Sequence, residues 1–225
     1  MEEIHTQKKS PKYTPEQIEA GLTAKNHTVK KSWIERMSFT PTPMQIERGL
    51  TDRHEDIKKA WIQRMDFTPT PEQIERGLTD ANPWIRIAWT QRLDFSPTAE
   101  QVERGLTDSN EWVRLTWAER SGYTPSMEQI KRGLTDRDLV VRVAWTQRMG
   151  NDITPEHMDI IAQDSSYVII MAWLSRTEIT WPQSIIERGL QHQDANIREA
   201  WVEVLQRQNH KEHASHDDFT GMPNL

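Results

Sequence analysis

Tryptophan recurs at a fixed spacing of 28 residues along most of the chain. A period of roughly 20 to 50 residues is the signature of a repeat architecture, in which each unit packs only on its neighbours. The sequence therefore predicts one supersecondary unit stacked seven times. The tryptophans are Trp33, Trp61, Trp89, Trp117, Trp145, Trp173 and Trp201. The expected units are 14–41, 42–69, 70–97, 98–125, 126–153, 154–181 and 182–209.

Each unit opens with a helix-start signal. In the third unit, Thr70 is the expected N-cap, Pro71 takes the first helical position and Gln73 completes a capping box. Similar starts recur at Thr14, Thr42, Thr98, Ser126 and Thr154. We therefore expect a short first helix in every unit, with its apolar face formed by residues such as Ile74 and Leu78.

A glycine recurs inside the expected first helix. Glycine costs about 1 kcal/mol in a helix interior, so its repetition predicts a place where the bulky tryptophan or a backbone approaches closely. The members are Gly21, Gly49, Gly77, Gly105, Gly133 and Gly189.

A second helix is expected in each unit after a short turn. In the third unit the turn is Thr79-Asp80, and the helix should run from about Trp84 to Leu93. At 100° per residue, Ile85, Trp89 and Leu93 fall on one apolar face. This arrangement predicts that the repeated tryptophans form the core. A base-stacking role for them is the less favoured alternative.

Two helices per unit, a turn aspartate and an arginine six residues later resemble HEAT-like repeats. The matching pairs are Asp80 with Arg86, Asp108 with Arg114 and Asp136 with Arg142. A typical HEAT repeat has about 40 residues, so the short HEAT-like and variant leucine-rich families are the closer analogues. The resemblance covers residues 14–209. It implies an all-α, right-handed α-solenoid whose second helices line its concave side.

Composition and the chain ends complete this expectation. Residues 1–13 are expected to be a flexible segment, and residues 210–225 a disordered tail. The tail carries His210, His213 and His216, for which we expect no more than adventitious metal binding. The chain has no cysteine, no signal-peptide pattern and no apolar run longer than eight residues. These features predict a soluble, cytoplasmic protein.

Two columns of cations accompany the tryptophans. Arginine stands three residues after most of them (Arg36, Arg64, Arg92, Arg120, Arg148 and Arg176), and lysine or arginine three residues before most of them (Lys30, Lys58, Arg86, Arg114, Arg142 and Arg198). One interpretation is a track for a phosphate backbone. The favoured interpretation is structural pairing, because the net charge is −6. The expected partners are the turn aspartates and Glu47, Glu75, Glu103 and Glu187.

The outer face of the second helix carries the candidate binding site. The positions two and five residues before the tryptophans are polar in the end units and apolar in units three to six. We expect these residues to form an apolar ribbon on the concave surface, although packing between adjacent second helices is the alternative. The ribbon residues are Trp84, Ile87, Trp112, Leu115, Val140, Val143, Val168 and Met171.

The sequence therefore predicts a protein-binding module, such as an inhibitor, adaptor or regulator. Its partner is expected to present an apolar helix or strand edge with basic flanks. No catalytic motif stands out, so we expect no enzyme activity, no cofactor and no resident metal. The first alternative is a nucleic-acid binder or a HEAT-like DNA glycosylase, which the negative charge disfavours. The second is a homo-oligomeric scaffold, so that a monomer and a homodimer both remain open.

Overall fold

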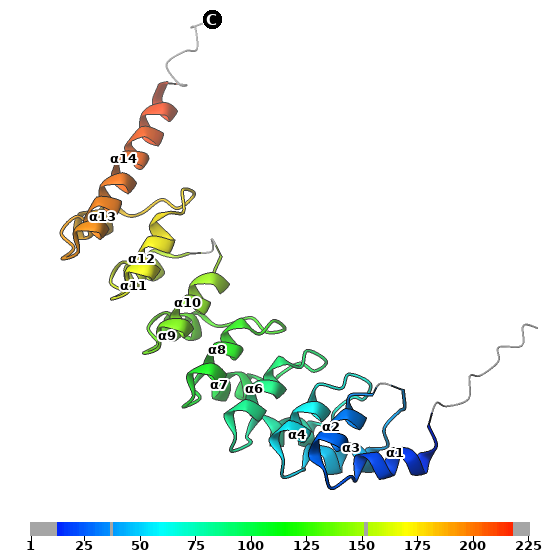
Figure 1. Ribbon diagram of the computed structural model, residues 1–225. Coiled ribbons are helices and arrows are strands. Elements are labelled where there is room, and N and C mark those ends of the chain that lie inside the picture. The colour runs from blue at the N-terminus through cyan, green and yellow to red at the C-terminus, as the bar shows by residue number, and fades with distance from the viewer. Residues whose placement is uncertain (1–12, 37, 151–152, 218–225) are drawn as a thin grey trace, which may run out of the picture. The chain divides into compact units, whose positions relative to one another are not determined.

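The structure of the chain is a computed structural model that describes residues 13–36, 38–150 and 153–217, with side chains up to residue 211. The described residues form helices joined by turns and loops, and no strand occurs among them (Figure 1). They divide after Tyr123 into two compact units. The first holds the repeats up to the fourth, and the second holds the fifth to the seventh. The chain is thus an all-α protein of helix-turn-helix repeats, as predicted.

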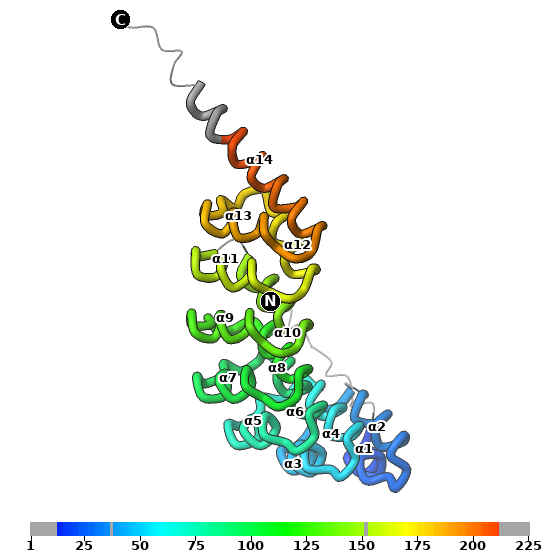
Figure 2. The backbone as a smooth tube through the Cα atoms, turned by 90° about the vertical axis from the view of Figure 1, so that its left-hand side faces the viewer, coloured from blue at the N-terminus to red at the C-terminus, as the bar shows by residue number. Residues whose placement is uncertain are grey.

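The helices come in pairs, one pair for each expected repeat. The first unit contains α1 (Pro15–Leu22), α2 (His27–Ile34), α3 (Pro43–Leu50), α4 (Glu55–Ile62), α5 (Pro71–Leu78), α6 (Pro83–Gln91), α7 (Ala99–Leu106) and α8 (Glu111–Glu119). The second unit contains α9 (Met127–Leu134), α10 (Leu139–Arg148), α11 (Pro155–Ala162), α12 (Tyr167–Leu174), α13 (Gln183–Gly189) and α14 (Ala195–Asp217). Within the first unit, α5 and α7 lie in one row and α6 and α8 in another (Figure 2).

The first helix of a repeat begins where the capping box was predicted. In the third repeat, the backbone N–H of Gln73 donates to the Thr70 hydroxyl (3.3 Å), and the backbone N–H of Thr70 donates to the Gln73 amide oxygen (3.1 Å). This reciprocal arrangement satisfies two backbone donors that a helix start otherwise leaves without partners. The same box starts α1, α3, α7, α9 and α11. Helix α13 lacks it, because Pro182 stands at its N-cap.

The second helix is held by the turn that precedes it. The Asp80 carboxylate accepts from the backbone N–H of Asn82, and the Asn82 side chain then accepts from the backbone N–H of Trp84. The predicted end of this helix was wrong, since α6 ends at Gln91. Arg92 is already extended, with a ψ of 125°. Leu93 therefore leaves the predicted apolar face and is 62% exposed.

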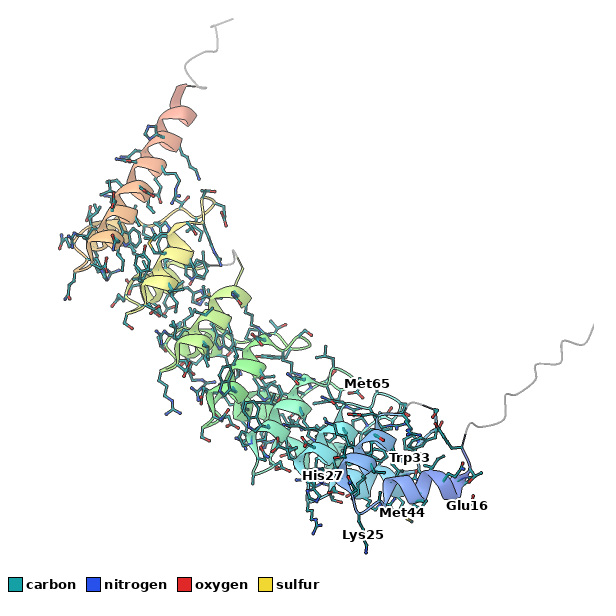
Figure 3. All side chains as sticks on the ribbon, viewed as in Figure 1. Glu16, Lys25, His27, Trp33, Met44 and Met65 are labelled. Atoms are coloured by element: carbon teal, nitrogen blue, oxygen red, sulfur yellow. The ribbon has the colours of Figure 1, made fainter. Side chains whose placement is uncertain are left out.

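In every hairpin except the sixth, where Ile161 replaces the glycine, the core contains a contact between the glycine of the first helix and the tryptophan of the second. Trp89 is 2% exposed, and a Cβ atom on Gly77 would lie 2.1 Å from its Nε1 atom. The other glycines of this column face their tryptophans in the same way. In the first repeat, Trp33 closes over Gly21 on α1 (Figure 3). The predicted close approach is therefore confirmed.

The C-terminal helix extends past residue 209, the expected last residue of the seventh repeat. Helix α14 runs on to Asp217, because no glycine or proline interrupts residues 195–217 and good helix formers such as glutamine, glutamate and alanine are frequent there. The side chains of His213 and His216 lie outside the described residues, as does nearly all of segment 1–13. Within the described part, no group of three or more histidine or acidic side chains could hold a metal ion. No described helix is long and apolar enough to cross a membrane.

Candidate partner-binding surfaces

Two tryptophans outside the core column stand exposed on neighbouring helices of the first unit. Trp84 and Trp112 are the second residues of α6 and α8, which pack directly on each other. Trp84 is 48% exposed and Trp112 is 44% exposed. The backbone N–H groups of both residues donate to capping asparagines, Asn82 and Asn110, so both positions are fixed by their helix starts. The structure thus places two large apolar side chains in equivalent, solvent-facing positions.

The position two residues before the core tryptophan is less accessible than predicted. Ile87 is 9% exposed and belongs to the core, and Leu115 is half-buried. The physical reason is the close packing of α4, α6 and α8, which covers the flanks of the second helices. For Ile87 the assignment to an exposed ribbon was therefore wrong.

The second unit carries an apolar patch at the corresponding helix starts. Val140 is 38% exposed and Val168 is 59% exposed, whereas Val143 and Met171 are half-buried. The sequence interpretation did not include Leu139 and Tyr167, which are also exposed. The signal was present in the sequence: apolar residues occupy the first position of α10 and α12, where the first unit has His27, Glu55, Pro83 and Glu111.

A lysine from the preceding repeat lies over Trp84. The Lys59 ammonium is 5.6 Å from the centre of the Trp84 ring, within the range of a cation–π interaction. Lys59 is also paired with Glu55, and the Asn82 amide donates to the same carboxylate (2.7 Å). These bonds from Lys59 and Asn82 hold the pKa of Glu55 below its usual value. One side of Trp84 therefore faces an ordered polar cluster.

The arginines that follow the core tryptophans join consecutive repeats through backbone carbonyls. Arg92 is 3% exposed, and its Nη1 donates to the carbonyl oxygens of Ile62 (2.9 Å) and Arg64 (3.0 Å). Its Nη2 donates to the carbonyl oxygen of Phe67 (3.1 Å) and also pairs with the Asp94 carboxylate. Arg64 makes the equivalent bonds one repeat earlier. These guanidiniums satisfy the carbonyls at the end of the preceding second helix.

The other cation column binds the turn aspartate of the next repeat. Arg86 holds Asp108 with two bonds, from Nε (2.8 Å) and Nη2 (2.7 Å), and its Nη1 donates to the carbonyl oxygen of Asp80 (2.8 Å). Further ion pairs of this kind include Lys30–Asp52, Lys58–Asp80 and Arg142–Asp164. The predicted role of the turn aspartates as partners is confirmed, and each pair spans two repeats.

The expected role of the first-helix glutamates was wrong in part. Glu47 and Glu75 pair with Arg76 (2.8 Å) and Arg104 (2.7 Å), which belong to the first helix of the next repeat and to neither predicted column. The reason is geometric: the first helices form their own row and their charged faces meet there. Glu187 accepts a bond from Gln183.

Acid is expected to weaken these first-helix links. Hydrogen bonds from Arg76 and Gln73 hold the pKa of Glu47 below its usual value, and bonds from Gln101 and Arg104 do the same for Glu75. A carboxylate whose pKa is lower in the folded state stabilises the fold above its unfolded pKa, and this stabilisation disappears as the pH falls through the folded pKa.

The melting temperature should therefore fall as the pH drops below about 4.3, which thermal melts between neutral and strongly acidic pH would measure. A Glu47→Gln/Glu75→Gln variant should show a shallower acid-side fall. Because both pairs are exposed, the effect of each is small. A melting temperature with no acid-side decrease would contradict this assignment.

A scan against protein-family models finds no match for this chain, and a search of curated proteins finds none either.

Proposed function

We propose that the protein is a protein-binding module that engages its partner through the exposed starts of its second helices. Trp84 and Trp112 carry this proposal. Tryptophan is enriched in interface hot spots, and a large exposed apolar patch on a folded surface typically marks an interaction site. Both residues sit on helices that neighbouring repeats hold in place, so little ordering is needed when a partner binds.

The cation network supports a protein partner over a nucleic acid. A phosphate-binding surface needs arginines and lysines that face solvent and release counterions on binding. Arg64 and Arg92 instead lie buried against backbone carbonyls, and Lys58 and Arg86 are paired with aspartates. The net charge of −6 acts in the same direction.

The surface chemistry indicates what a partner has to provide. Trp84 and Trp112 call for an apolar segment, such as one face of a helix or a strand edge. Asp56 is exposed at the equivalent position of the second repeat, so a basic flank on the partner would complement that end. Kinship with HEAT-like or variant leucine-rich repeats, and a role as an inhibitor, adaptor or regulator, belong to the same proposal.

The test is a comparison of partner capture by the wild type and a Trp84→Glu/Trp112→Glu variant. An acidic residue suits this position, because Asp56 occupies it in α4. Loss of two hot-spot tryptophans should weaken binding about 30-fold or more. The matched control is Met44→Glu/Met65→Glu, which changes two side chains that are 77% and 57% exposed (Figure 3).

All variants must first show the circular dichroism and melting behaviour of the wild type. A protein retained by the wild type and the methionine control, but not by the tryptophan variant, would support the proposal. A protein retained equally by all three would place the interface elsewhere and refute it. Recovery of nuclease-sensitive nucleic acid by all three would favour the nucleic-acid alternative.

A further inference from the structure

The outer face of the seventh repeat has the features of a surface that receives another repeat. The residue after the core tryptophan is buried wherever a further repeat packs on it, as in Ile62 (1% exposed), Thr90 (0%) and Leu174 (3%). Val202 occupies this position in α14 and is 41% exposed. Among the described residues, no hairpin follows α14. An apolar docking position is therefore left open at this end.

Arg198 on the same face is oriented like the arginines that bind a following repeat. Its Nη1 donates to the carbonyl oxygens of His192 (2.7 Å) and Gln193 (2.8 Å). Arg86 is anchored in the same way by Asp80 and Ala81, while its Nε and Nη2 hold the aspartate of the next repeat. In Arg198 these two nitrogens have no partner among the described residues. Two backbone carbonyls thus hold the Arg198 guanidinium in place, and its Nε and Nη2 atoms remain available to bind a carboxylate.

Two further residues complete the pattern. Leu190 is half-buried, whereas its counterparts Leu50 and Leu78 are 8% and 6% exposed beneath the next repeat. Glu187 is exposed and has no ion pair with any residue that the structure describes, although its counterpart Glu47 binds an arginine of the following repeat. The face therefore combines an apolar centre with one cation, Arg198, and one anion, Glu187, that are both available for an ion pair.

The first repeat differs from the later ones at the positions that link a repeat to the one before it. Ala20 stands where later first helices carry the linking arginine, and Ala24 stands where later turns carry the linking aspartate. Arg36 donates to the hydroxyl of Tyr13 (3.0 Å), which directly precedes the first repeat. The seventh repeat has no such replacement at Arg198, Glu187 or Val202. Its open groups are therefore specific to that end.

We propose that this face, formed by Glu187, Leu190, Arg198 and Val202, is a second interaction surface that binds a helical hairpin of another protein. The hairpin presents an aspartate to Arg198 and a guanidinium to Glu187, as a following repeat does inside each unit. Buried apolar contact at Val202 provides the affinity, and the bidentate Arg198 pair fixes the register. This surface does not depend on Trp84 or Trp112.

The probe is a synthetic peptide with the sequence of residues 70–97, which contains Arg76 and Asp80. It is titrated into the isotopically labelled full chain and followed by nuclear magnetic resonance. The expected shifts are at the Arg198 Nε–H group, Leu190 and Val202. An Asp80→Asn peptide should bind about tenfold more weakly, because a charge-assisted pair is lost.

Matched variants separate the possible outcomes. Arg198→Gln should bind both peptides equally, Val202→Glu should lose binding, and Val29→Glu, which changes a residue that is 44% exposed on α2, should bind like the wild type. The Trp84→Glu/Trp112→Glu variant should also bind the peptide normally, so failure here is distinct from failure of the proposed function. Absence of shifts at Val202 with about 1 mM peptide would overturn the proposal. So would a homodimer in light scattering that Val202→Glu dissociates, because a second copy would then occupy the face.

Discussion

Replacing Gly77 with alanine is expected to destabilise the protein by about 3 kcal/mol. In an isolated helix the same change stabilises by about 1 kcal/mol, so the expected effect has the opposite sign to helix propensity. The cause is steric, because the new Cβ atom would lie 2.1 Å from the buried Trp89 ring, so that the ring or α5 has to shift. The melting temperature should fall by about 6–12 °C, which calorimetry would measure.

A double-mutant cycle with Trp89→Leu tests the steric cause. The smaller side chain leaves space beside Gly77, so alanine should cost much less in that background than in the wild type. An equal cost in both backgrounds would show that the ring contact is not responsible. A stabilising effect of Gly77→Ala in the wild type would contradict the predicted packing outright.

Replacing Arg92 with methionine should cost about 4 kcal/mol. Methionine keeps the apolar stem of the side chain, but it leaves the carbonyl oxygens of Ile62, Arg64 and Phe67 without their donor. Asp94, whose pKa is held low by its bond to Arg92, also loses its partner. Denaturant unfolding followed by circular dichroism would measure the loss, which lies at the junction of the second and third repeats.

Arg76→Met is the matched control within the same repeat. Arg76 pairs with Glu47 on the surface, where both side chains are 46% exposed. Exposed pairs of this kind contribute between about 0 and 1 kcal/mol, so this variant should stay close to the wild type. If both variants cost the same, burial would not decide the energy of these cations, and the assigned role of Arg92 would be wrong.

The fold was predictable from sequence wherever all the residues that determine a feature lie in the same hairpin. Thr70 and Gln73 determine a helix start by local hydrogen bonds, and Gly77 faces Trp89 because both lie in the same repeat. The prediction failed at Leu93, because helical periodicity does not indicate where a helix stops. Here Arg92 leaves the helical conformation and turns its side chain to the preceding repeat.

The candidate surface was predictable only in part, because its exposure depends on contacts between repeats. Trp84 and Trp112 are exposed as expected, but the packing of neighbouring second helices covers Ile87. Periodic spacing placed the cations correctly and could not assign all their partners, since Arg86 binds an aspartate 22 positions away and Glu47 binds an arginine outside both columns. The handedness of the array and a continuous ribbon across both units stay predictions.

The central claim is that Trp84 and Trp112 bind the partner, and a calorimetric titration of the purified captured protein tests it most directly. The Trp84→Glu/Trp112→Glu variant should bind about 30-fold or more weakly than the wild type. The Met44→Glu/Met65→Glu variant should bind within about twofold of it. Equal affinities for all three proteins would contradict the account and place the interface outside the starts of α6 and α8.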